Sequence, residues 1–100
     1  ALGRGHAWYV GTELAAEGWA ALLGVAAAHA GLRPPLAAPA EVEVGERHAA
    51  DGTRYTFLLN HGDAPATVAA PDLRGAELLT GATLTGEVRL PPLGVAIVRR

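Results

Sequence analysis

The acidic side chains are candidates for acid/base chemistry, because two Asp or Glu residues flanking a bond are the minimum apparatus for glycoside hydrolysis. Glu41 and Glu43 alternate along an expected strand, which puts their Cβ atoms about 6.5 to 7 Å apart, within the range that such chemistry uses. Alternating Glu residues are also typical of the solvent face of a half-buried sheet, and nothing apolar nearby would raise either pKa. Glu13 and Glu17, four residues apart on an expected helix, are a mildly repulsive solvated pair. We therefore expect no catalytic residue among these carboxylates.

The four His residues are the remaining candidates for metal binding or proton transfer, because the chain contains no Ser, Lys, Cys, Met or Gln. Their absence excludes Ser and Cys nucleophiles, Schiff-base lysines, thiolate metal sites and disulfides. No two of the four His residues have the three- or four-residue spacing that forms a ligand face on a helix. His29 is expected near a helix C-terminus, and His61 in a turn where it contacts its own backbone. We therefore expect no metal and no cofactor.

Aromatic side chains could serve as stacking platforms for sugars if they were exposed. The whole complement is Trp8, Tyr9, Trp19, Tyr55 and Phe57. Aromatics in alternating strands and on apolar helix faces are usually core residues. Trp8 and Trp19 are the two candidates for sugar contact.

Composition limits the partners and the location. The chain has 100 residues, a net charge of -2 and eight scattered Arg residues, so no basic surface for nucleic acid is expected. Its most apolar stretch, Leu14 to Leu32, contains Glu17, three Gly and His29, which favours a soluble helix over a membrane span. The beginning at Ala1, without a signal peptide, suggests a piece of something longer. The lack of Cys fits a reducing compartment, and we expect the bacterial cytoplasm.

The first third of the chain reads as a strand, a tight turn and a helix. Residues 6–10 are aromatic and β-branched and lie between two glycines, which predicts a short strand. Thr12 is then expected as the helix N-cap, with apolar residues recurring at three- and four-residue spacing from Leu14 onwards. Gly31 is expected as the C-terminal cap of this amphipathic helix. Because one strand cannot satisfy its own backbone hydrogen bonds, residues 6–10 need a sheet from elsewhere.

The rest of the chain predicts an all-β unit after a proline-rich joint. Residues 33–40 contain three prolines and read as an extended linker. Asp51-Gly52 then predicts a two-residue hairpin turn between two alternating runs. Further short strands are expected near residues 66–70, within 78–90 (punctuated by Gly81 and Gly86) and at 94–98. The fold class is mainly β, a small antiparallel β-sandwich with Greek-key-like order, preceded by an N-terminal strand and one amphipathic α-helix.

The same residues resemble a known family. Residues 3–12, Gly-Arg-Gly-His-Ala-Trp-Tyr-Val-Gly-Thr, are similar to the last strand and following helix of the middle domain of glycoside hydrolase family 42 β-galactosidases. The runs at 55–61, 78–81 and 90–98 resemble the C-terminal β-sandwich of that family. The resemblance implies the division 1–32, end of a middle α/β domain; 33–40, linker; and 41–100, C-terminal β-domain.

In this family the parent enzyme is a retaining hydrolase whose two catalytic glutamates lie in an N-terminal barrel, and the middle domain contributes to a trimer. No barrel motif has a counterpart here. The resemblance therefore implies a non-catalytic C-terminal region with a structural or assembly role, and no catalytic, cofactor or metal residue. Its expected partner is the remainder of the parent enzyme, with a homo-oligomer through that parent. Two alternatives are a carbohydrate-binding module, which would display a solvent-facing Trp or Tyr beside polar side chains, and an independent hydrolase, which would need convergent carboxylates with one strongly perturbed pKa.

Overall fold

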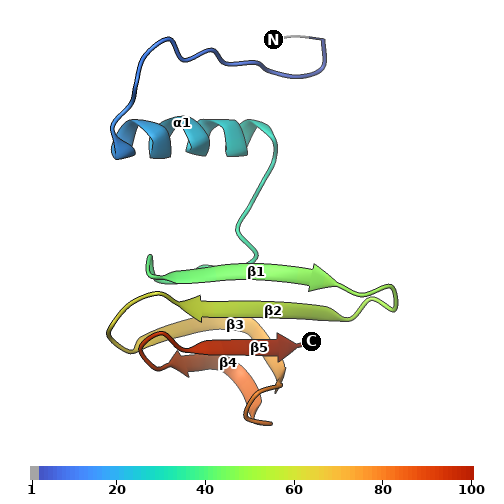
Figure 1. Cartoon of the computed structure of the whole chain (residues 1–100). Helices are drawn as coiled ribbons and strands as arrows, with labels where there is room; N and C mark the ends of the chain where they lie inside the picture. Colours follow the sequence, from blue (N-terminus) through green and yellow to red (C-terminus); the bar gives the residue numbers. More distant parts are fainter. Residues whose placement is uncertain (1–2) are drawn as a thin grey trace. The chain divides into compact units, whose positions relative to one another are not determined.

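A computed structural model describes residues 3–100 of the chain. The chain forms two compact units, which meet in sequence between Arg33 and Pro34. The first unit holds one helix, α1 (Ala16–His29), and the second holds five strands (Figure 1). The strands are β1 (Val42–His48), β2 (Arg54–Asn60), β3 (Ala66–Glu77), β4 (Thr83–Leu90) and β5 (Val95–Arg99). The mainly β fold class with one preceding helix is confirmed.

The helix begins later than the sequence predicts. Its N-cap is Ala15, which makes no side-chain cap, whereas the hydroxyl of Thr12 donates to the carbonyl of Glu13. The C-terminal cap is as expected: Gly31 has φ +69°, its N–H donates to the carbonyl of Ala28, and a second bond runs from Leu32 to Ala27. This is the Schellman arrangement, which needs a residue that tolerates the left-handed region.

Residues 6–10, predicted to form a strand, form none in the structure. The physical reason is that an extended segment needs a neighbouring strand, and residues 3–33, the described part of this unit, contain a single β-bridge at Gly5 but no strand. None of the residues of α1 is buried either, and only one stripe along it, including Gly18 and Leu22, is half-buried. The first unit thus leaves apolar side chains exposed on α1 and in residues 6–10.

The five strands form one antiparallel sheet in the order β1-β2-β5-β3-β4. Two hairpins, β1-β2 and β3-β4, lie on either side of the last strand. A Greek key places its fourth strand beside its first, so the Greek-key detail is not confirmed. The β1-β2 hairpin turns where Asp51-Gly52 predicts, but its loop has three residues: Ala49 and Thr53 are hydrogen-bonded, and Gly52 has φ +87°. A type I turn followed by a left-handed residue is the usual three-residue solution.

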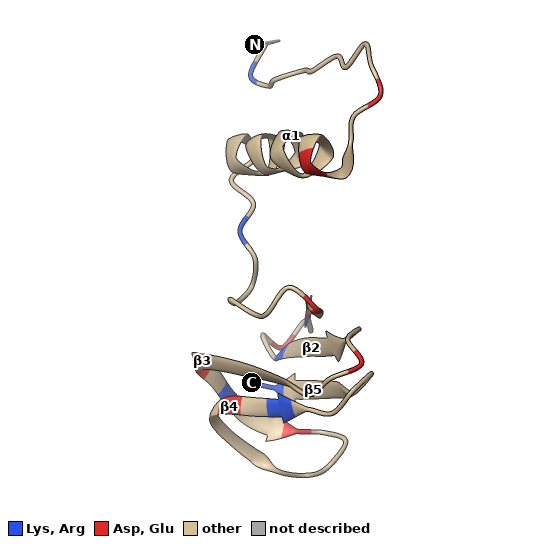
Figure 2. Cartoon of the chain, turned by 90° about the vertical axis from the view of Figure 1, so that its left-hand side faces the viewer, with Lys and Arg blue, Asp and Glu red and all other residues tan. Residues whose placement is uncertain are grey.

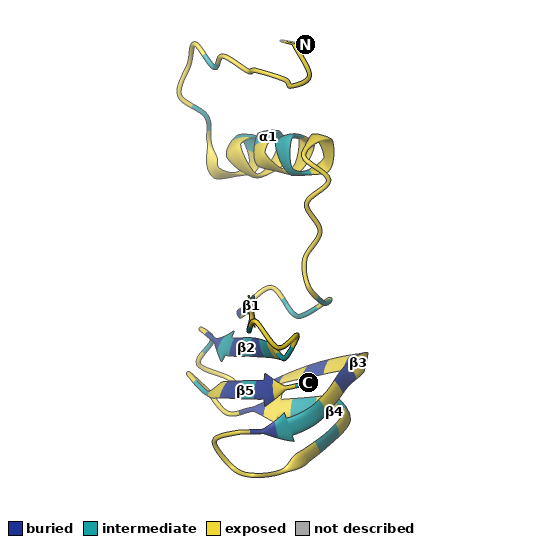
Figure 3. Ribbon diagram, turned by 90° about the vertical axis from the view of Figure 1, so that its right-hand side faces the viewer, coloured by how far each residue is buried: buried dark blue, intermediate teal, exposed yellow. Residues whose placement is uncertain are grey.

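The β3-β4 hairpin is longer and more irregular than the sequence suggests. Ala69 pairs with Glu87 and Arg74 pairs with Thr85, so four residues of β3 oppose Gly86 alone. Gly86, expected at a turn, lies inside β4 with φ +115°. Such a bulge bends the strand pair (Figure 3) and carries Pro71, which could not join a regular ladder.

The core lies on one face of the sheet, because buried and exposed residues alternate along the strands (Figure 3). All strands contribute to it, which is consistent with a small β-sandwich. Two residues before β1, Leu36 and Ala38, pack against this cluster. The buried apolar residues are Val42, Leu58, Ala66, Val68, Ala70, Leu73, Leu90, Ala96 and Val98.

Candidate functional site

The first candidate for sugar contact, Trp8, lies in an aromatic cluster. Its ring centroid is 5.7 Å from that of His6 and 5.5 Å from that of His29. The two imidazoles are closer still, with centroids 4.4 Å apart. The cluster lines a hollow of about 270 Å³ to which Arg4 also contributes, and Trp8 is 45% exposed. An aromatic ring beside polar side chains is the chemistry of a sugar platform.

The second candidate, Trp19, lies near the start of α1 and is 44% exposed. It is not among the residues that line the hollow beside Trp8. The structure therefore does not combine the two tryptophans into one platform. Sugar contact by Trp8 or Trp19 remains a prediction.

The proximity of His6 and His29 is a feature that sequence analysis missed. Twenty-three positions separate them, so no helical spacing connects the two residues. His29 does lie in the last turn of α1 as expected. Within residues 3–100, no three His, Cys, Asp or Glu side chains gather as metal ligands. No helix in the same residues has both the length and the hydropathy to cross a bilayer.

The other two histidines contact glutamates of β1. His61 Nε2 lies 2.9 Å from Glu43 Oε2, and His48 Nε2 lies 3.3 Å from Glu46 Oε2. The Glu43 and His61 side chains are both more than 60% exposed, so this contact is a solvated pair and of little energetic weight. His61 thus bonds to a side chain of the neighbouring strand rather than to its own turn. That turn is held instead by Asn60, which is buried and bonded to Gly62, Ala64 and Pro91.

Glu77, at the end of β3, is the most buried carboxylate of the described residues, with 3% exposure. It accepts hydrogen bonds from the N–H groups of Leu79 (3.1 Å), Thr80 (2.7 Å) and Ile97 (3.0 Å), and from the Thr80 hydroxyl (2.5 Å). Burial by itself would raise the pKa of Glu77, but these donors outweigh it and lower the pKa to about 2. The carboxylate is therefore ionised at neutral pH and serves as a fixed acceptor joining the β3-β4 turn to β5.

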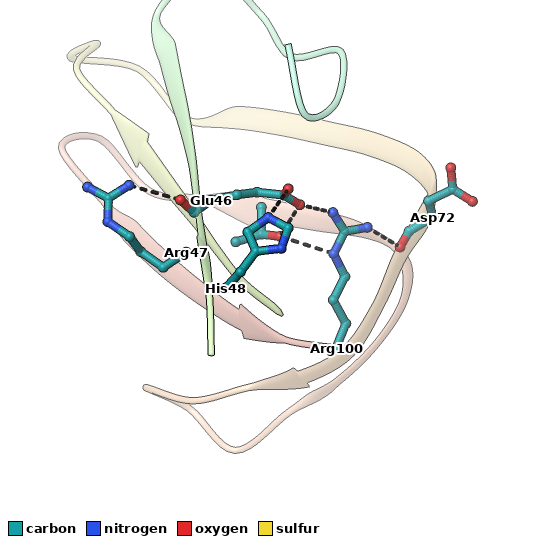
Figure 4. A network of polar contacts seen from close by, with 6 residues as sticks. Glu46, Arg47, His48, Asp72 and Arg100 are labelled. Carbon is teal, nitrogen blue, oxygen red and sulfur yellow. Dashed lines mark hydrogen bonds and ion pairs between the residues drawn. The ribbon is translucent and has the colours of Figure 1, made fainter. Parts of the chain in front are cut away.

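A second polar cluster joins three strands around Arg100 (Figure 4). The guanidinium pairs with Glu46 of β1 and donates to the Thr56 hydroxyl of β2 (3.1 Å) and to the carbonyl of Asp72 in β3 (3.1 Å). Both side chains of the ion pair are largely buried, at 10% exposure for Arg100 and 16% for Glu46. Burial tends to raise the pKa of Glu46, but the bond and charge of Arg100, aided by His48, lower it.

The chemistry of these acidic groups is structural. A general acid for glycoside hydrolysis needs a carboxyl with a raised pKa close to a second carboxylate. The pKa values of Glu46, Asp51 and Glu77 are all lowered, in Asp51 chiefly by the Thr53 N–H at 2.9 Å. Glu77 accepts four hydrogen bonds from within the chain, Glu46 is bound by Arg100, and Asp51 accepts one from the Thr53 N–H. These carboxylates thus offer anchoring points for strands and turns.

Comparison with known proteins agrees with this interpretation. Residues 41–100 match the family described as β-galactosidase C-terminal domain. A β-galactosidase from Arthrobacter sp is 40% identical over 98 residues, which cover 98% of this chain and 14% of that protein. The β-galactosidase BgaP from Planococcus sp. (strain L4) is 37% identical with the same coverage. The chain therefore spans about one-seventh of the length of these relatives.

Two solved structures are similar in fold. A β-galactosidase from Bacillus circulans sp. alkalophilus is 38% identical, with a TM-score of 0.67 over 79% of this chain and 12% of that one. Gan42B, a GH42 β-galactosidase from G. stearothermophilus, has a TM-score of 0.77 over 92% of this chain and 14% of its own; at 24% identity it supports the fold alone. With its family match covering residues 41–100, the chain belongs to the family of C-terminal domains of glycoside hydrolase family 42 β-galactosidases.

Proposed function

We propose that this chain is the non-catalytic C-terminal region of a β-galactosidase and that its own contribution is structural. The observation that carries the proposal is the internal saturation of its buried acidic groups. Glu77 and Glu46 are each bound by donors of the chain itself and have lowered pKa values. The match to one-seventh of the relatives' length supports the same conclusion, because the remainder would carry the catalytic glutamates.

The proposed organisation follows the sequence prediction. Residues 1–32 would be the end of a middle α/β domain, 33–40 a linker, and 41–100 the C-terminal β-domain. Two findings support an incomplete first unit: residues 6–10 form no strand within the part of the chain that the structure describes, and Leu23 of α1 is 62% exposed. Assembly of the parent through its middle domain and a bacterial cytoplasmic location belong to the same proposal.

The test is an assay of the 100-residue chain on o-nitrophenyl β-galactoside. We expect no hydrolysis above a buffer control, and hydrolysis by the longer protein that contains the chain. Turnover by the isolated chain would overturn the proposal, and so would a longer protein that lacks activity on β-galactosides.

A second candidate function, carbohydrate binding, rests on one observation. Trp8 is 45% exposed and lies beside the polar side chains of Arg4, His6 and His29. Titration of the chain with galactose, followed by NMR, decides between the two roles. Localised chemical-shift changes at the Trp8 indole N–H would favour carbohydrate binding. An unchanged spectrum at millimolar galactose would favour the structural role.

A further inference from the structure

The outer face of β1, β2 and β5, opposite the core, is unusually apolar. The registers align three rows across it, with Gly45, Phe57 and Ile97 in the middle row. Glu43, Leu59 and Val95 form the row on one side, and Arg47, Tyr55 and Arg99 the row on the other. Leu78 adjoins this face, because its N–H donates to the carbonyl of Ile97. We call these positions the β1-β2-β5 face.

Exposure separates this face from the rest of the sheet. Val95 and Leu78 are 45% and 44% exposed, and Tyr55, Phe57, Leu59 and Ile97 are half-buried. The outer face of the β3-β4 hairpin is polar by contrast, with exposed positions that include Thr67, Thr85, Glu87 and Arg89. An antiparallel sheet with one solvated face shows polar residues on that face, as β3-β4 does. A contiguous apolar patch beside it indicates an interaction surface.

Gly45 gives this surface a specific point of contact. Glycine in a strand interior weakens the strand, and it marks a bulge, a bend or the close approach of another backbone. The β1-β2 register runs without interruption through Gly45, which excludes a bulge, and its φ is not positive. A Cβ built there would meet no atom within 4 Å, so no neighbour inside this chain demands glycine. The missing side chain instead opens a hollow of about 390 Å³ bounded by Glu43, Arg47, Phe57 and Leu59.

Charges at the two ends of the face define what would fit over it. Glu43 stands at one end, and Arg47 and Arg99 stand in one row at the other (Figure 2 colours the charged positions). A complementary surface would place carboxylates opposite the two arginines and a basic group opposite Glu43. Its centre would be apolar, with a stretch of main chain entering the hollow at Gly45.

We propose that the β1-β2-β5 face docks onto the polypeptide that precedes this chain in the parent enzyme, with main chain of that polypeptide seated against Gly45. The proposal rests on the proposed function, since it requires a parent. The amount of chain outside the structure favours this occupant: the relatives are about seven times longer, and 86% of their length is available to cover the face. The exposed apolar side chains are those that such an interface would bury.

Thiol labelling tests the proposal directly. The 100-residue chain has no Cys, so one introduced Cys gives a single signal in it. In the longer protein, labelling is followed by mass spectrometry of the proteolytic peptide that contains the introduced Cys. Ile97→Cys reports on the β1-β2-β5 face, and Thr67→Cys, on the polar outer face of β3, is the matched control. Maleimide labelling rates are compared between the 100-residue chain and the longer protein that contains it. We expect labelling at position 97 to be slowed about tenfold or more in the longer protein, because a covered side chain reacts only on opening, and labelling at position 67 to be unchanged.

The other outcomes overturn the proposal. Equal rates at position 97 in both proteins would show an uncovered face. If labelling at position 97 of the 100-residue chain became slower as its concentration rose, a second copy of the chain would be what covers the face. Hydrolysis of o-nitrophenyl β-galactoside is measured on the same longer protein, so an inactive protein with a protected position 97 refutes the proposed function and leaves the docking in place.

Gly45→Val, combined with Ile97→Cys, supplies a second, independent readout. In the 100-residue chain the added side chain meets open space, so the melting temperature should not fall. In the longer protein it would obstruct the seated main chain, so labelling of the thiol introduced at position 97 should return to the rate of the isolated chain. Thr67→Val is the control and should leave that rate slow. Continued protection of position 97 in the Gly45→Val protein would exclude main-chain contact at Gly45.

Discussion

The carboxylate of Glu77 accepts a hydrogen bond from the backbone N–H of Ile97, 3.0 Å away across the β3-β5 boundary. The two strands share only two paired positions, at Ala76 and Glu77, so little ladder joins them. Glu77 also holds the turn that leads into β4. The Glu77 side chain therefore ties the β3-β4 hairpin to β5, the strand that lies between it and the β1-β2 hairpin.

Glu77→Gln should destabilise the chain by about 3 kcal/mol, because a neutral amide weakens charge-assisted bonds and cannot accept all of them. Urea unfolding followed by circular dichroism measures the loss. Glu87→Gln is the control, since Glu87 is exposed on β4. Equal midpoints for the two variants would contradict the anchoring role of Glu77.

Stability should also depend on pH through the same group. The folded pKa of Glu77, about 2, lies below the ordinary value of 4.5, so the unfolded chain binds a proton first as the pH falls. The contribution is complete above about pH 5 and is lost progressively as the pH falls towards 2. Urea midpoints measured from pH 6 to pH 2 should decline in the native protein and decline less in Glu77→Gln. Parallel profiles for the two proteins would refute this assignment.

Arg100 should stabilise the sheet by pinning β1, β2 and β3 at one end. Arg100→Met removes the charge, leaves Glu46 without its main partner, and should cost about 2 to 3 kcal/mol. Arg99→Met is the control, because the preceding residue, Arg99, is exposed. In a double-mutant cycle with Glu46→Gln, the two losses should be clearly less than additive. Additive losses would show that the pair is energetically independent.

The sequence predicts the elements of this fold better than their details. Alternation identifies β1 and β2, a short apolar run identifies β5, and Asp51-Gly52 locates the first hairpin, because all three signals are local. The predicted strand at 66–70 stops before Pro71, since proline cannot join a ladder; in the structure a bulge accommodates it and β3 continues to Glu77. Gly86 suggests a turn because glycine is common in turns, but its positive φ serves the bend inside β4.

The polar anchors could not be predicted in the same way. Glu46 and Arg100 are 54 positions apart, and Glu77 and Ile97 are 20 apart, so only the fold brings them together. The contact between His6 and His29 is missed for this reason as well. The sequence does predict the solvated setting of Glu43, whose side chain is 64% exposed beside His61.

Gly75 and Gly45 are both strand glycines, and they should respond to alanine in opposite directions. At Gly75, φ is +146° and a Cβ would lie 2.1 Å from the carbonyl oxygen of Arg99, so backbone must move to admit it. Gly75→Ala should therefore separate β3 from β5 and destabilise the chain by about 3 kcal/mol or more. Gly45→Ala meets open space at an ordinary φ and should be neutral or stabilising by up to about 1 kcal/mol. Thermal unfolding of the two variants beside the parent chain measures the contrast; a Gly75→Ala protein as stable as Gly45→Ala would show that β3 and β5 do not meet at Arg99.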